Sequence, residues 1–189
     1  AGGADVDHQL EQLKTHAHET ISMDQLAKAL RENLDDVANP QLRIRLLHYT
    51  AELLETEIHS LPQATELLEQ IRMEHPGDAK ALTALRRIYD EMGEVDALID
   101  VMSALEGAKG SDDPAGRVDL MVERATLQHR VLNSSHEAAM LLRTALMERP
   151  EHSGAIDLLE ELAQDPEVFP IARETLEPLF RERADTYRL

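Results

Sequence analysis

Residues 43–88 read RIRLLHYTAELLETEIHSLPQATELLEQIRMEHPGDAKALTALRRI, and residues 117–162 read RVDLMVERATLQHRVLNSSHEAAMLLRTALMERPEHSGAIDLLEEL. The two stretches align without a gap at a displacement of 74 positions. Thirteen of the 46 aligned pairs are identical, and most of these are Leu or Ala at helical spacing. A chain that repeats itself in this way builds stacked repeats rather than one irregular core. Because repeat stacks usually present an extended surface to another macromolecule, the recurrence favours binding over chemistry.

Nearly the whole chain carries the apolar periodicity of amphipathic helices. In residues 40–59, for example, Leu47, Ala51, Leu54 and Ile58 share one face by the i, i+3, i+4 rule. Pro and Gly fall mainly between the periodic segments, and no strand-like alternation of useful length occurs. The pattern predicts helices at about 10–21, 24–35, 40–59, 62–75, 78–92, 94–107, 114–132, 136–148, 152–164 and 167–183.

Short connections between successive helices imply antiparallel neighbours. We therefore expect an all-α fold, an α-α superhelix (solenoid) of stacked antiparallel helix pairs forming one domain over residues 1–189. Its superunits are expected at about 24–93 and 94–164, followed by an extra C-terminal helix at about 167–184.

Three features depart from a regular array. We expect a flexible loop at Gly107–Gly116, and a slip of the repeat register after Asp165 because the last segment is longer than its counterpart. Asp185–Leu189 resembles the beginning of a further helix. We interpret the chain as an excerpt from a longer array, and an ordinary frayed terminus is the alternative.

Charge and composition exclude several classes of partner. The formal net charge is −18, so polyanionic nucleic acids and anionic membranes would be repelled. No apolar run reaches the roughly 18–20 residues that span a bilayer, so membrane insertion is not expected. The absence of cysteine excludes disulfides and thiolate metal sites. The compartment stays open, with the cytoplasm favoured, and so does the oligomeric state.

Within each copy, small residues and a closing proline stand at fixed positions. The spacing from the second-helix alanine to the proline is 12 in both copies, Ala64 to Pro76 and Ala138 to Pro150. With these residues the chain resembles the tetratricopeptide repeat, and in particular the long arrays of bacterial, myxobacterial-type proteins. The intervening units are more divergent. The resemblance rests on Ala51, Ala64, Leu68, Ile71 and Pro76 in one copy, and on Ala125, Ala138, Leu142, Ala145 and Pro150 in the other.

The resemblance implies a partner-binding concave face made by the first helix of each pair. Tetratricopeptide domains that grip chaperone tails carry a Lys/Asn carboxylate clamp there, but the matching positions hold His48 and Glu52, Thr83 and Arg87, or Val122 and Thr126. A chaperone-tail adaptor is therefore not expected. For any single residue on this face, an ordinary solvated side chain is the alternative. The partner-binding residues implied for a protein or peptide are Arg45, His48, Tyr49, Glu52, Lys80, Arg87, Glu123 and Arg130.

Candidate catalytic and metal motifs fail on spacing. His18-Glu19 and His136-Glu137 begin His-Glu-x-x-His, but Ser22 and Met140 stand where the second histidine is needed. The segment Gly107–Ser111 has neither the spacing of a phosphate-binding loop nor a preceding strand. We therefore predict no catalytic, cofactor-binding or metal site and expect that the chain is not an enzyme.

These observations predict that the chain is a noncatalytic scaffold or adaptor that mediates protein–protein interaction through the concave face of the array. The alternative is a structural spacer or self-assembly segment of a larger multi-repeat protein. A third interpretation is an accessory domain of an enzyme that lies outside this chain.

Overall fold

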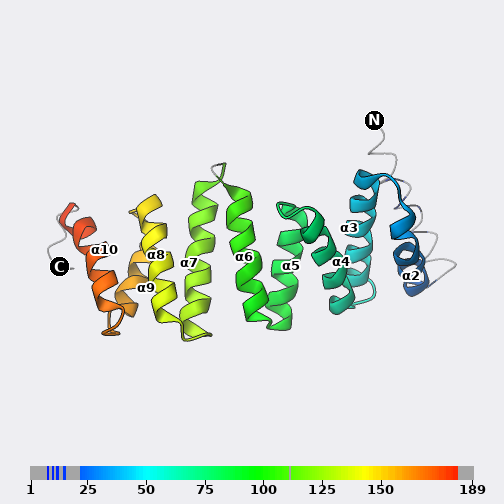
Figure 1. Ribbon diagram of the computed structural model, residues 1–189. Coiled ribbons are helices and arrows are strands. Elements are labelled where there is room, and N and C mark those ends of the chain that lie inside the picture. The colour runs from blue at the N-terminus through cyan, green and yellow to red at the C-terminus, as the bar shows by residue number, and fades with distance from the viewer. Residues whose placement is uncertain are drawn as a thin grey trace. The chain divides into compact units, whose positions relative to one another are not determined.

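The computed structural model describes residues 8, 10, 12, 15, 22–110 and 112–182. Within these residues the chain consists of helices and short connections, with no strand, so the predicted all-α class is confirmed. The elements are α2 (Met23–Asn33), a 3₁₀ turn (Leu34–Asp36), α3 (Pro40–Thr56), α4 (Leu61–Glu74), α5 (Ala79–Met92), α6 (Val95–Lys109), α7 (Pro114–Arg130), α8 (Ser135–Glu148), α9 (Ser153–Leu162) and α10 (Phe169–Glu182). Neighbouring helices pack against each other, as α3 with α4 and α6 with α7 (Figure 1).

The helix boundaries follow local capping chemistry. Asn39 accepts hydrogen bonds from the amides of Gln41 and Leu42, and Pro40 opens α3 with a φ angle already suited to a helix. Asp113 caps α7 in the same manner, since its Oδ1 accepts the Gly116 amide at 2.9 Å. The predicted bounds of the helices after residue 22 therefore agree with the structure to within a few residues. The expected helix at about 10–21 lies largely outside the described residues.

The loop expected at Gly107–Gly116 is much shorter than predicted. Helix α6 continues through Gly107 to Lys109 and ends at Gly110, whose φ of 52° suits a residue without a side chain. Helix α7 then begins at Pro114. The prediction was wrong because a glycine inside a helix costs only about 1 kcal/mol, which the packing of α6 on α7 readily offsets.

The register does not slip after Asp165, contrary to expectation. Helices α9 and α10 begin at Ser153 and Phe169, each 74 positions after the first residue of α5 and α6. The difference lies in the length of α9, which ends at Leu162 while α5 reaches Met92. Pro166 has no amide to continue the helix, so the connection at 163–168 takes up the difference.

The chain forms two compact units, residues 1–88 and 89–189. The core of the first includes Leu47, Leu54, Leu68, Leu82 and Leu85, all at most 3% exposed. The core of the second draws on α7 to α10 and extends from Ala125 to Phe180. The predicted single domain with two superunits stays a prediction.

Small residues are buried where the two helices of a pair meet. Ala51 on α3 and Ala64 on α4 are 2% and 0% exposed, and their counterparts Ala125 and Ala138 are both fully buried. An alanine at such a point lets the helix axes approach closely. The sequence had indicated this role for these positions.

We expect Ala138→Leu to lower the free energy of unfolding by about 1–3 kcal/mol, because the added atoms have no space between α7 and α8. Ala108→Leu is the matched control, since Ala108 is exposed on α6; its effect should stay within about 0.5 kcal/mol. Urea denaturation followed by circular dichroism measures both. Equal effects of the two substitutions would contradict the role assigned to Ala138.

Candidate functional site

Asp78 starts α5 and also ties it to α3. Its Oδ1 accepts the Ala81 amide at 2.8 Å, and its carboxylate lies 3.2 Å from Nε2 of His48. Burial raises the pKa of Asp78, but the hydrogen bonds from Ala81 and His48 outweigh burial and leave this pKa below its ordinary value. The first turn of α5 is therefore held against α3 by an ionised carboxylate.

Two more charge pairs continue along the same pair of helices. Lys80 Nζ lies 3.6 Å from Glu52 Oε2. About one turn further along α3 and two turns further along α5, both terminal nitrogens of Arg87 bind the carboxylate of Glu55, with Nη2 donating to Oε2 at 2.8 Å. The Glu55 side chain is only 8% exposed, whereas that of Arg87 is 59% exposed. We call the three pairs, His48–Asp78, Glu52–Lys80 and Glu55–Arg87, the α3/α5 ladder.

A second set of pairs joins α7 to the start and the end of α9. Asp119 Oδ1 lies 3.0 Å from His152 Nε2, and Glu161 binds Arg130 at 3.3 Å and approaches His129 at 3.8 Å. Nδ1 of His152 accepts the Ala155 amide at 3.0 Å, so the ring proton must sit on Nε2 and be donated to Asp119. We call this set the α7/α9 ladder.

The two ladders occupy related positions but differ in sign. At the displacement of 74, Arg87 corresponds to Glu161, and the cation that Glu161 binds is Arg130 of α7, so the acid and its cation have changed helices. At the N-terminal cap, Asp78 corresponds to His152, and the partner on the first helix changes accordingly from histidine to aspartate. The signs are thus exchanged at the Glu55–Arg87 position, whereas Glu52–Lys80 has no counterpart because Thr126 and Gly154 stand there.

The structure places the predicted partner-binding residues in three situations. His48, Glu52, Lys80 and Arg87 come together in the α3/α5 ladder. Arg45 and Tyr49 are half-buried on α3, and the Tyr49 hydroxyl donates to the Leu10 carbonyl at 2.9 Å. Glu123 and Arg130 are exposed on α7 of the second unit, where Arg130 belongs to the α7/α9 ladder. Their role in binding stays a prediction.

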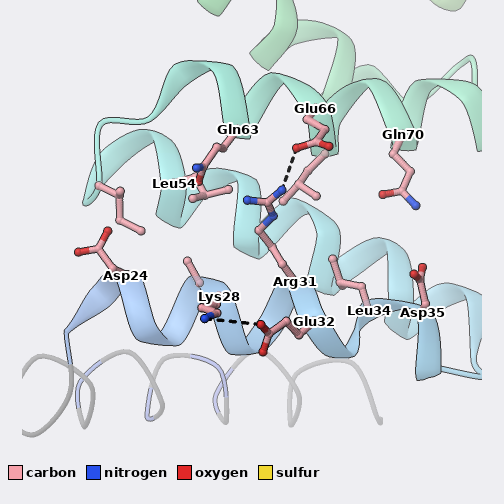
Figure 2. A pocket seen from close by; sticks show the side chains of 13 residues that line it. Asp24, Lys28, Arg31, Glu32, Leu34, Asp35, Leu54, Gln63, Glu66 and Gln70 are labelled. Atoms are coloured by element: carbon pink, nitrogen blue, oxygen red, sulfur yellow. Dashed lines mark hydrogen bonds and ion pairs between the residues drawn. The ribbon is translucent and has the colours of Figure 1, made fainter.

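A groove that sequence reasoning did not identify lies among α2, α3 and α4 (Figure 2). Its volume is about 600 Å³, and buried side chains such as Leu34, Leu54 and Leu67 line its apolar part. Arg31 reaches across from α2 and binds Glu66 of α4 at 2.8 Å, as the dashed line in Figure 2 shows. The lining residues come from α2, α3, α4 and the connections between them and are spread over residues 24–70, so no local motif signals the groove.

The structure locates some of the residues in the motifs considered from sequence, within the part of the chain that it describes. No group of three or more His, Asp or Glu side chains there could hold a metal ion. His136 is exposed at the start of α8, whereas His18 lies outside the described residues. Gly107 of the glycine-containing segment is helical. None of the described helices combines the length and apolar character needed to cross a bilayer.

Comparison with known proteins adds no family: no family model matches the chain, and a search of curated proteins finds no match.

Replacement of Asp78 separates its two contacts. Asp78→Ala should lower the free energy of unfolding by about 1–2 kcal/mol through loss of the cap, whereas Asp78→Asn, which can still accept the Ala81 amide, should lower it less. A depressed carboxyl pKa contributes stability that is present above the ordinary value of 3.8 and lost as pH falls through the folded-state value. The advantage of the wild type over Asp78→Asn should therefore shrink below about pH 3.8. Denaturation midpoints between pH 3 and 7 measure this trend, and a constant difference would contradict it.

Proposed function

We propose that the chain is a noncatalytic scaffold that binds a segment of another protein, with helix pairs stacked as in the tetratricopeptide arrays that its sequence resembles. Within each unit, a part of the partner lies across the first helices of two consecutive pairs, where the ladder of that unit runs. The observation that carries this proposal is the reversal of charge between the ladders. Arg87, the cation of the Glu55–Arg87 pair, corresponds to the acid Glu161, whose cation Arg130 lies on the other helix, α7.

A contact that served folding alone would not need this reversal. Either sign joins the two helices equally well, since an ion pair is symmetric to exchange of its partners. For a ligand lying across the surface, however, the exchange matters, because an acidic residue that pairs with Arg87 would be repelled by Glu161. Two units with one architecture and opposite patterns can therefore recognise different parts of one partner.

The ladder pairs are open enough to exchange partners. The side chains of Lys80 and Glu52 are 67% and 62% exposed, and those of Arg130 and Glu161 are 60% and 50% exposed. Exposed ion pairs contribute only about 0–1 kcal/mol, so a ligand can replace them at little cost. Glu55 differs, because its nearly buried carboxylate needs Arg87 and would stay paired.

These features define the chemistry of the partner. In two of the three pairs of the α3/α5 ladder, Glu52–Lys80 and Glu55–Arg87, a cation from α5 stands beside an acid from α3. A segment that carries both charges therefore fits this surface better than a polycation or a polyanion. The net charge of −18 further opposes a nucleic acid. The spacer or self-assembly function and the accessory domain of an external enzyme remain the alternatives. A spacer would bind no segment at the ladders.

The test uses two charge exchanges that each keep the net charge and an internal ion pair. The double variant Glu52→Lys with Lys80→Glu inverts the α3/α5 ladder at its most exposed pair. The double variant Arg31→Glu with Glu66→Lys inverts the pair across the groove and is the matched control. We expect 15-residue peptides selected on the wild-type chain from a random library to bind the ladder variant at least about tenfold more weakly, as measured by fluorescence anisotropy.

The same peptides should bind the groove variant with unchanged affinity. Binding that is lost only in the groove variant would move the site to α2, α3 and α4. If neither exchange alters binding, the ladder is not the recognition surface and the proposal fails.

A further inference from the structure

His152 and Asp78 hold corresponding positions of the repeat, and each caps a helix. Nδ1 of His152 accepts the Ala155 amide at 3.0 Å, and its Nε2 lies 3.0 Å from Oδ1 of Asp119. Asp78 accepts the Ala81 amide at 2.8 Å through a carboxylate oxygen. A ring nitrogen of histidine accepts a hydrogen bond only while it carries no proton. The cap of α9 therefore exists only with a neutral imidazole, a condition that the carboxylate cap of α5 does not share.

The first turn of α9 is weak without this cap. Helix α9 begins with Ser153 and Gly154, where α5 begins with Ala79 and Lys80. Glycine costs about 1 kcal/mol in a helix relative to alanine, and serine also forms helices less readily than alanine does. The imidazole lies against this turn, because a Cβ atom added to Gly154 would lie 3.4 Å from Cε1 of His152. One titratable side chain thus closes a turn whose own residues favour it little.

The charged groups around the ring determine what protonation does to it. Asp119 of α7 faces Nε2 and binds an imidazolium at least as well as a neutral ring. Arg149, in the connection between α8 and α9, lies 3.6 Å from the same oxygen of Asp119 and 3.6 Å from Glu151. At Nδ1, by contrast, a proton would face the Ala155 amide, so that two donors would meet at the positive end of the helix dipole. The contact to Asp119 therefore survives protonation, and the cap does not.

We propose that His152 is a pH-sensitive switch that closes the first turn of α9 when its ring is neutral and releases this turn when the ring is protonated. The Ala155 amide then keeps its bond of 3.2 Å to the His152 carbonyl, which has the poorer geometry of a 3₁₀ turn. Ala155 and Ile156 are 0% and 1% exposed and belong to the core of the second unit, so the switch acts on one edge of that core. It is a property of the chain alone and goes beyond the proposed binding function.

Amide hydrogen exchange of the full chain, followed by NMR, measures the two caps separately. The protection factor corrects for the pH dependence of exchange itself. We expect the protection factor of the Ala155 amide to fall at least about tenfold from pH 7.5 to pH 5.0, because an ordinary imidazole is protonated about thirty to one at pH 5.0. The Ala81 amide is the internal control, since Ala81 is equally buried and is capped by Asp78. Its protection factor should change less than about twofold.

Two histidine variants assign the response to one ring. His152→Asn keeps a side-chain oxygen that can accept the Ala155 amide and that does not titrate in this range. In this variant we expect the protection factor of Ala155 to be the same at both pH values within about twofold. His136→Asn, at an exposed position at the start of α8, should keep the full wild-type response. Circular dichroism at both pH values establishes that the variants remain folded.

Three results would overturn the proposal. They are a protection factor of Ala155 that does not change with pH in the wild type, equal losses at Ala155 and Ala81, and a response that persists in His152→Asn. Equal losses would mean that acid loosens the chain in general. These measurements use the chain without a partner, so failure of the switch and failure of the proposed function are distinguishable.

Discussion

The structure depends on the close approach of the two helices within each pair. Ala64 and Ala138 have no exposed surface, and each faces a first helix that also presents a buried alanine. An ion pair between the start of the first helix and the end of the second accompanies this contact in both copies, Arg43 with Glu74 and Arg117 with Glu148. Because the pair closes in the same way each time, the chain can vary the outer surface of the first helices without changing the fold.

The independence of the buried helix contact from the outer surface explains which positions agree between the two copies and which do not. Identity is concentrated at buried Leu and Ala positions and at the retained Arg–Glu pair. The ladders keep their location but not their residues. Asp78 and His152 cap corresponding helices with different chemistry, a carboxylate in one copy and an imidazole nitrogen in the other. Folding requires an acceptor at the cap and does not specify which one, so the identity of that residue is free to serve the surface.

Local signals explain why the helices could be predicted and why other features could not. Apolar periodicity and capping residues act within a few positions, so the helix bounds and the buried alanines were accessible from sequence. The left-handed backbone conformations of His59 and Asn133 were not accessible from sequence. These two residues lie 74 positions apart and adopt φ angles of 57° and 54° in the turn after the first helix, where a glycine is the usual signal. The ladders and the groove join side chains about 30 or more residues apart, and periodicity says nothing about which charges meet.

A single position of the repeat, held by Glu106 in α6 and by Phe180 in α10, shows that burial constrains the partner of a side chain more than its polarity. On α6, Glu106 is buried because Arg124 of α7 accompanies it, and burial raises the pKa of that carboxyl despite its arginine partners. A carboxylate at this position is tolerable only when its partner helix brings a cation. At the corresponding position of α10, Phe180 is 3% exposed and belongs to the apolar core of the second unit. The same position of the repeat is therefore buried in both helices, with a charge pair in α6 and an aromatic side chain in α10.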